Sequence, residues 1–155
     1  MSGKREKKGI TLYHHDKRRS GLVAQEVLGD YSGYVHCDMN GGYRQLETAK
    51  LVGCWSHVRR KFFETTPNQV DKTSLGCKGL DYCDKMFALE AEWNALSPKD
   101  RLVKRKETLA PLMAIFFDRC RYQAVFPGSK LGRALDCSLK HDKTFKTVLE
   151  FGGFK

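Results

Sequence analysis

Asp38 is the carboxylate of this sequence that we consider first as a catalytic residue. Asp38 ends a run, beginning at Gly33, in which tyrosine, valine and cysteine favour a buried strand. Residues 40–42, which include two glycines, then break that strand. In an open α/β sheet, a carboxylate at the carboxyl end of a strand faces the crevice where ligands bind. The alternative is that Asp38 caps the element that follows, and spacing alone favours that alternative.

A basic helix is predicted shortly after this carboxylate. A second strand is expected at residues 50–54, and a helix at residues 56–65 has Val58 and Phe62 one turn apart on its apolar face. The other faces carry Arg59, Arg60 and Lys61. These three cations are candidates for phosphate contacts, and a solvated helix face is the other explanation for them.

Six cysteines raise the question of a zinc site. Cys54 and His57 have the spacing of half a site, but Cys77 and Cys83 are further apart than the roughly two to four residues typical of structural zinc. Cys37 lies on a predicted buried strand, where cysteine packs as a small apolar residue. We therefore expect reduced cysteines and no zinc.

The charge balance favours a polyanionic partner. The chain has 28 Lys and Arg against 18 Asp and Glu, a formal net charge of +10. Cations that neutralise phosphates release condensed counterions, although a generally basic surface is the alternative explanation. The basic clusters are Lys4 to Lys8, Lys17-Arg18-Arg19, Arg59-Arg60-Lys61 and Lys104-Arg105-Lys106. Their dispersal predicts several basic faces on a folded surface, with Arg18 and Arg19 among the phosphate contacts.

The composition is typical of a globular chain. Hydrophobic residues make up 41% and charged residues 30% of its 155 residues, enough for one domain. No apolar run approaches the roughly 20 residues that span a bilayer. Residues 1–8 lack the apolar centre of a signal peptide. We therefore expect a cytoplasmic protein with no membrane partner.

Strands are expected only in the first third of the chain. Alternating residues predict a strand at 9–15, before the two strands named above. A short helix between them has Ser20 as its N-cap and Gly29 just past its end. The fold class is therefore α/β, with helices occupying everything after the strands.

Three helices are predicted in the rest of the chain. The first has its apolar stripe on Met86, Leu89, Trp93 and Leu96. The second begins at a cap formed by Ser97, with Pro98 at its first position, and Pro111 should kink or divide it. The last follows the break at residues 127–129 and carries Leu131, Leu135, Leu139, Phe145 and Leu149.

A longer motif surrounds Asp38. It combines the strand ending in aspartate, a Gly/Tyr turn, and a Cys-Trp-x-His-Val-Arg-Arg sequence with an aromatic residue after it. The residues that carry it are Gly33, Tyr34, Asp38, Gly42, Tyr43, Cys54, Trp55, His57, Val58, Arg59, Arg60 and Phe62. This motif resembles the catalytic core of the insertion sequence 66 family of bacterial transposases. Residues 19–21, 96–98 and 129–134 extend the resemblance over nearly the whole chain, while Met39 and Asn40 replace the usual Gly and Tyr.

The resemblance implies a partial RNase H-like fold with about three strands in the first third, a mainly helical insertion and C-terminal helices. The implied divisions are a partial RNase H-like core at 1–66, a linker at 67–80, a helical insertion at 81–127, and a truncated C-terminal helix of the core at 128–155.

The resemblance also implies metal-dependent DDE chemistry. Such sites use two Asp and one Glu to hold a pair of Mg²⁺ or Mn²⁺ ions. By resemblance, Asp38 is the second Asp, both metal ligand and catalytic residue. The first Asp and the Glu are not found, and neither Asp16 nor Glu150 matches a family ligand, so we expect no stable metal binding by this chain alone. His57 either hydrogen-bonds near the metals or phosphate, or is simply packed.

The implied function is transposition of an insertion sequence, a mobile element. The full-length family protein would cut and join transposon DNA by phosphoryl transfer, and this chain is expected to be a fragment truncated at both ends. The alternative is a catalytically dead remnant that only binds DNA non-specifically or associates with a full-length transposase. Missing first strands would leave an unpaired strand edge, so self-association is also expected.

Overall fold

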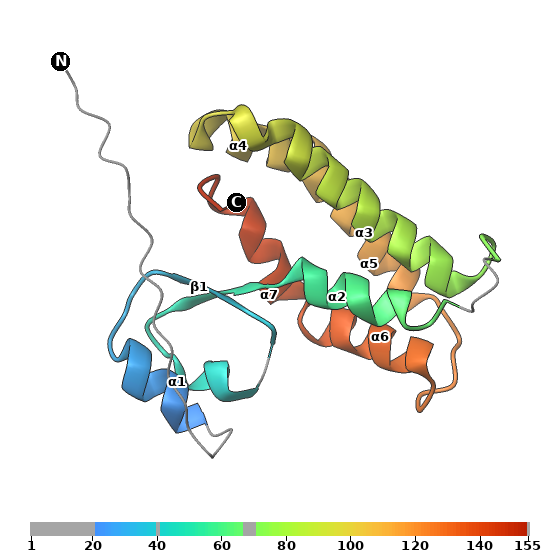
Figure 1. The fold of residues 1–155 in the computed structure, drawn as a ribbon, viewed down its shortest axis with the longest axis horizontal. Helices are drawn as coiled ribbons and strands as arrows, with labels where there is room; N and C mark the ends of the chain where they lie inside the picture. Colours follow the sequence, from blue (N-terminus) through green and yellow to red (C-terminus); the bar gives the residue numbers. More distant parts are fainter. Residues whose placement is uncertain (1–20, 40, 67–70, 155) are drawn as a thin grey trace.

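The computed structural model describes residues 21–39, 41–66 and 71–154, which are mixed α/β and mostly helical (Figure 1). The first elements are α1 (Gly21–Leu28), β1 (Tyr34–Cys37), the 3₁₀ helix η1 (Gly41–Gln45), β2 (Lys50–Gly53) and α2 (Trp55–Phe63). The others are α3 (Leu75–Glu92), η2 (Trp93–Ala95), α4 (Pro98–Lys104), η3 (Arg105–Leu109), α5 (Ala110–Arg121), α6 (Lys130–Lys140), α7 (Asp142–Lys146) and η4 (Thr147–Leu149). The strand predicted at 9–15 and the Ser20 cap lie outside the described residues.

The two strands form a parallel pair. Tyr34 lies opposite Lys50, and Cys37 lies opposite Gly53. The amide of Cys54 donates to the carbonyl of Cys37 over 2.9 Å, which extends the ladder by one bond beyond the strands. Both strands and α2 therefore confirm the predicted order, with β1 ending directly before Asp38. This pair is the only sheet in the described part of the chain, so the RNase H-like assignment stays a prediction.

One hydrophobic core joins the segments that the sequence assigned to different domains. It combines side chains of α2, α3, α5, α6 and α7, among them Val58, Phe62, Cys83, Met86, Met113, Phe116, Phe117, Leu135 and Phe145. Val58 and Phe62 are buried, as the helical spacing predicted. The predicted insertion at 81–127 thus packs on the same core as the segments before and after it. The domain divisions themselves stay predictions.

Helix α3 begins inside the segment predicted to be a linker. Residues 75–80 are helical, and the side chain of Ser74 caps the helix by accepting from the amide of Cys77 over 3.2 Å. Gly79 is a packing residue here, because a Cβ on it would lie 2.3 Å from Cδ1 of Phe62. The glycine-rich composition that suggested a linker instead lets α3 approach α2 closely.

A π-helical turn separates α4 from α5. Ser97 caps α4 by accepting from the amide of Asp100 over 3.2 Å, and Pro98 occupies the first turn, as predicted. The amide of Ala110 donates to the carbonyl of Arg105, five residues earlier, and Pro111 then stands in the first turn of α5. Proline removes an amide donor and crowds the preceding turn, which explains the change from α-helical to π-helical geometry before it. The predicted division of this helix at Pro111 is confirmed.

The single helix predicted after Ser129 is two helices. The chain leaves α-helical geometry at His141, with φ −119° and ψ 20°, between α6 and α7. The bend brings Phe145 beneath β2, where a Cβ on Gly53 would lie 2.3 Å from Cδ1 of Phe145. The apolar spacing did not reveal the bend, because Leu135 and Phe145 contribute to one core from both sides of it.

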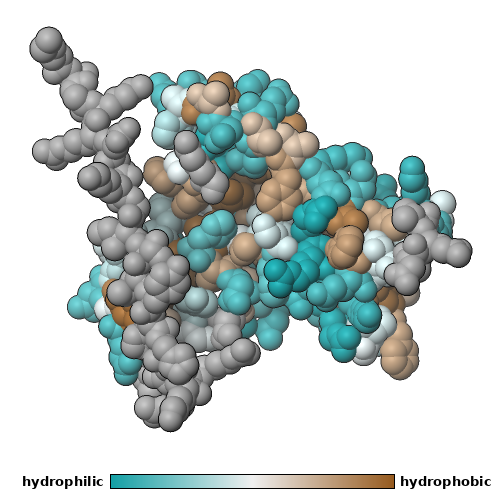
Figure 2. All heavy atoms as spheres, viewed as in Figure 1, coloured by the Kyte–Doolittle hydropathy of each residue, from teal (hydrophilic) through white to brown (hydrophobic). Residues whose placement is uncertain are grey.

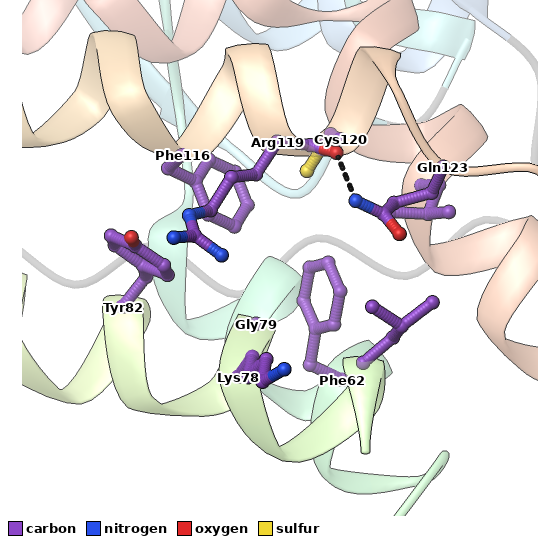
Figure 3. Close-up of a pocket in the computed structure, with 10 residues that line it drawn as sticks. Phe62, Lys78, Gly79, Tyr82, Phe116, Arg119, Cys120 and Gln123 are labelled. Carbon is purple, nitrogen blue, oxygen red and sulfur yellow. Dashed lines mark hydrogen bonds between the residues drawn. The ribbon is translucent and has the colours of Figure 1, made fainter. Parts of the chain in front are cut away.

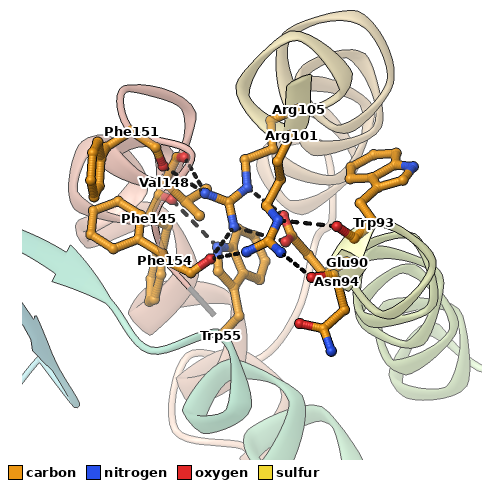
Figure 4. Close-up of polar contacts among 10 residues, drawn as sticks. All are labelled: Trp55, Glu90, Trp93, Asn94, Arg101, Arg105, Phe145, Val148, Phe151 and Phe154. Atoms are coloured by element: carbon orange, nitrogen blue, oxygen red, sulfur yellow. Dashed lines mark hydrogen bonds and ion pairs between the residues drawn. The ribbon is translucent and has the colours of Figure 1, made fainter. Parts of the chain in front are cut away.

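Two buried arginines hold the C-terminal segment (Figure 4). Arg105 is 2% exposed and makes a two-pronged ion pair with Glu90, at 2.6 and 2.8 Å. It also donates to the carbonyls of Phe151 and Phe154 at 2.6 and 3.0 Å. Arg101 reaches the same Phe154 carbonyl at 2.8 Å. The prediction of a basic surface at 104–106 is therefore wrong for Arg105, which no apolar pattern marks as buried.

Candidate functional site

Asp38 lies at the carboxyl end of the parallel pair, where the sequence placed it. It is exposed and directly follows β1. The bond between the Cys54 amide and the Cys37 carbonyl brings the beginning of α2 beside this end of the strand. Asp38 thus stands at the edge of the sheet where α/β proteins bind ligands. Its roles as catalytic residue and metal ligand stay predictions.

The residue after Asp38 has an uncommon backbone. Met39 has φ 68°, the left-handed region, and it is the only non-glycine residue with positive φ in the described part of the chain. Its side chain packs partly buried against the core, with its sulfur 4.0 Å from the Cys37 thiol. Glycine is the residue that adopts such a φ without steric cost. The turn therefore keeps the shape that glycine would allow, although methionine occupies the position.

A cavity of about 210 Å³ lies beside this end of the sheet. It is bounded by His36 of β1, the first turn of α2, the middle of α3 and the C-terminal segment. Its lining residues are mainly apolar or aromatic, and the Glu90–Arg105 pair is the charged part of its wall. Glu90 and Arg105 neutralise each other. The cavity therefore offers a ligand apolar packing surface rather than an unpaired charge.

The three basic residues of α2 do not form one surface. Arg59 is bound through its Nε to Oδ1 of Asp84 on α3, and this hydrogen bond raises the pKa of Arg59 above its usual range. Arg60 is exposed, and Lys61 is half-buried near Cys137 of α6. The prediction that all three contact DNA remains untested, and Arg18 and Arg19 lie outside the described residues.

His57 lies in the first turn of α2, and its side chain is partly exposed. Its backbone amide donates to the carbonyl of Cys54 over 3.1 Å. Both interpretations of His57, a polar contact near the metals or phosphate and simple packing, stay predictions.

The described residues contain no group of three or more His, Cys, Asp or Glu side chains that could hold a metal ion. Two of the cysteines, Cys83 and Cys120, are buried in the core, and burial raises the pKa of each thiol to about 12. Such thiols stay protonated at neutral pH and pack as apolar groups. Asp38 likewise belongs to no such group of three or more among the described residues.

A second, smaller cavity lies between α3 and α5 (Figure 3). It holds about 30 Å³, and its wall includes the Arg119 guanidinium, which stands 5.6 Å from the centre of the Tyr82 ring. Gln123 closes one side by donating to the carbonyl of Arg119 over 3.0 Å. This volume accommodates little more than a water molecule. It is a packing gap and not a substrate site.

Sequence reasoning missed that two cations far apart in the sequence act on the same histidine. Arg44 of η1 and Lys140 of α6 both act electrostatically on His141, and burial together with these charges lowers the pKa of His141. No linear cluster contains both residues, so charge runs along the chain could not reveal them.

The part of the chain that the structure describes contains no helix long and apolar enough to cross a membrane.

Comparisons with known proteins identify relatives of this chain. Two curated relatives come from Sinorhizobium fredii (strain NBRC 101917 / NGR234). Uncharacterized protein y4hP is 26% identical over 118 residues, covering 65% of this chain and 21% of the relative. Uncharacterized protein y4qI is 25% identical over 119 residues, covering 70% of this chain and 22% of the relative.

The chain thus spans about a fifth of the length of these relatives. No solved structure matches it. The family model described as "Transposase IS66 family" matches residues 1–155. By that match over its whole length, the chain belongs to the IS66 transposase family.

Proposed function

We propose that this chain is a region of the catalytic core of a DDE-type transposase that cuts and joins DNA by metal-dependent phosphoryl transfer. The family match is the observation that carries the proposal. The unit formed by β1, Asp38, β2 and α2 supports it, because the carboxylate follows a parallel strand at its ligand-binding end. On this proposal the strand pair belongs to an RNase H-like sheet, and the protein acts on DNA in the cytoplasm.

Asp38 is the residue of this region that we assign to metal binding. The divalent cations, Mg²⁺ or Mn²⁺, would supply charge stabilisation and nucleophile activation at the reacting phosphate. The described residues do not by themselves fit a pair of cations, because Asp38 belongs to no group of three or more potential ligands among them. We therefore assign no catalytic step to this region alone.

Binding of Mn²⁺ tests the assignment without requiring activity. Paramagnetic Mn²⁺ should broaden the amide resonances of residues 37–39 in the isotope-labelled chain, and Asp38→Asn should abolish that broadening. Asp136→Asn provides the matched control, since it neutralises an exposed carboxylate on α6, away from the sheet edge. Broadening at residues 37–39 that persists in Asp38→Asn would contradict the role of Asp38.

The second candidate function is a non-catalytic remnant that binds DNA or associates with a full-length transposase. This candidate is favoured for the chain acting alone because the described residues contain no group of three or more potential metal ligands. Supercoiled plasmid incubated with the chain and Mn²⁺ should therefore remain uncut. Nicking above background that disappears in Asp38→Asn would instead show that the chain is catalytically competent.

A further inference from the structure

Strand β1 is attached less firmly to the core than its neighbour β2. In β2, Val52 is fully buried, and a Cβ on Gly53 would meet the ring of Phe145. In β1, Cys37 is the one buried residue, and the strand pairs only with β2 in the described part of the chain. The position of the residue that follows β1 therefore depends on what else holds this strand.

Aromatic rings hold one face of β1. Tyr34 stacks on Phe151, with ring centres 5.4 Å apart and ring planes 8° from parallel. Phe154 meets both rings edge-on, with its centre 5.1 Å from that of Tyr34 and 5.2 Å from that of Phe151. Alternation along the strand places His36 on the same face as Tyr34, and its ring centre lies 6.5 Å from that of Phe154. We call Tyr34, Phe151 and Phe154 the aromatic clamp.

The segment that supplies two of these rings is fixed by Arg105. This guanidinium donates to the carbonyls of Phe151 and Phe154 at 2.6 and 3.0 Å, and its central carbon lies 5.9 Å from the centre of the Phe154 ring. Figure 4 shows the two rings on the side of the segment away from Glu90, which binds the same guanidinium. Arg105 therefore connects the aromatic clamp to α3 and η3.

The backbone of this segment is also closely packed. Gly152 is buried, and a Cβ on it would collide with the carbonyl oxygen of Pro98. On the face shown in Figure 2, hydrophobic side chains gather below α4, in the region that the C-terminal segment crosses. Glu150 also pairs with Lys50 of β2 over 2.9 Å, but exposed ion pairs contribute little to stability. The rings are therefore the main attachment between this segment and β1.

The far end of β1 controls where Asp38 lies relative to α2. The carbonyl of Cys37 belongs to the peptide bond that joins it to Asp38, and it accepts from the amide of Cys54 over 2.9 Å. Because β1 spans only Tyr34–Cys37, a displacement of Tyr34 should move the whole short strand and with it this carbonyl. The bond between Cys54 and Cys37 therefore reports the position of Asp38.

We propose that Arg105 is a positioning residue for Asp38, and that it acts by fixing the aromatic clamp against β1. The proposal rests on the proposed function, which makes Asp38 a metal ligand. The two-pronged pair with Glu90 orients the guanidinium and leaves donors for the carbonyls of the segment. Lysine has no such fork, so it cannot bind Glu90 through two parallel bonds and hold both carbonyls at once.

Removal of one ring tests the aromatic clamp in the whole chain. Phe154→Ala deletes the ring but keeps the carbonyl that Arg105 binds, whereas Phe154→Tyr keeps the ring. The matched control is Phe126→Ala, which deletes an aromatic ring that is 81% exposed, on the loop after α5. Hydrogen exchange of the three variants and the wild-type chain is followed by NMR, with the amides of α3 and α5 as the reference for global stability.

Exchange should accelerate at the strand and not in the helices. In Phe154→Ala, the amides of residues 34–37 and of Cys54 should exchange about tenfold faster, since a well-packed aromatic contact is lost. The amides of α3 and α5 should change less than about twofold, because they open with the helical core. Phe154→Tyr and Phe126→Ala should behave as the wild-type chain does. Equal acceleration of strand and helices would show that Phe154 only stabilises the fold, and would overturn the proposal.

Paramagnetic broadening separates position from stability. In the wild-type chain, Mn²⁺ at Asp38 should broaden residues 37–39 and also residues 54–57, which the Cys54–Cys37 bond brings close. Phe154→Ala should weaken the broadening at residues 54–57 and retain it at 37–39, and Phe154→Tyr should restore both. Unchanged broadening at residues 54–57 in Phe154→Ala would contradict the positioning role. Absence of broadening at 37–39 in the wild-type chain would instead contradict the metal-binding role of Asp38, and the exchange rates would still test the aromatic clamp.

A double variant tests whether Arg105 acts through the aromatic clamp. Arg105→Lys should accelerate exchange at residues 34–37, and by a smaller factor when Phe154→Ala is already present, because both changes release the same ring. Glu90→Gln, which keeps the shape of the side chain and one acceptor for Arg105, gives the same comparison if Arg105→Lys does not fold. Factors that multiply independently in the double variant would refute the route from Arg105 through Phe154.

Discussion

Met39 shows how one residue carries backbone strain beside the candidate catalytic carboxylate. A left-handed φ costs a residue with a Cβ about 1–2 kcal/mol, and Met39 adopts it at φ 68°. Its side chain offsets part of that cost by packing against the core beside Cys37. Backbone and side chain therefore have opposite effects on the stability of this turn.

Comparison of two substitutions separates these effects. Met39→Ala and Met39→Gly both remove the packing, but only glycine removes the strain, so Met39→Gly should be the more stable by about 1 kcal/mol. Urea unfolding measures the difference. At Gln45, an exposed residue of η1 without positive φ, the order should reverse and alanine should be favoured. Equal stability of the two Met39 variants would show that the turn relaxes without strain.

At the scale of elements, local patterns predicted those parts of the chain whose signals act within a few residues. The Ser97 cap, the division at Pro111 and the Val58–Phe62 stripe were all predicted, because each depends on neighbouring residues. The start of α3, the bend at His141 and the burial of Arg105 were not. The bend and the buried arginine depend on partners far along the chain, which no local pattern encodes. The start of α3 has a local cap at Ser74, but the glycines beside it suggested a linker.

Substitution of Gly79 tests whether a contact with a distant residue outweighs local helix propensity. Helix propensity alone predicts that Gly79→Ala stabilises α3 by up to about 1 kcal/mol. The close approach to Phe62 predicts the opposite, a loss of about 1–3 kcal/mol from overpacking. Thermal or urea unfolding decides between them. Gly41→Ala is the control, since a Cβ there meets nothing within 4 Å and should leave stability nearly unchanged. Stabilisation by Gly79→Ala would mean that α2 and α3 are not held this closely together.

At the scale of the whole molecule, the shared core and the short sheet differ in how firmly they are held. Helices α2, α3, α5, α6 and α7 contribute to one buried cluster, so they should open together. β1 pairs only with β2 in the described part of the chain, and a strand with an unpaired edge invites association with another chain. The cooperative unit should therefore be the helices rather than the predicted domains.

Hydrogen exchange with sizing chromatography checks this expectation. Amides of α2, α3 and α5 should exchange with one common free energy of opening, and amides of residues 34–37 should exchange faster. The chain should also elute as larger species when its concentration is raised. A monomer at every concentration, with residues 34–37 protected as well as the helices, would show that the strand pair is completed within this chain.

The arginines that hold the C-terminal segment also set the order in which the nascent chain can mature. Arg101 and Arg105 need the carbonyls of Phe151 and Phe154, which are synthesised about fifty residues later. Glu90, Trp93 and Asn94 accept from these arginines earlier in synthesis. Until the carbonyls of Phe151 and Phe154 leave the ribosome, burying either guanidinium would leave its remaining donors without acceptors. The native packing of α3, α4 and α5 around these two guanidinium groups is therefore completed only after residue 154 has emerged.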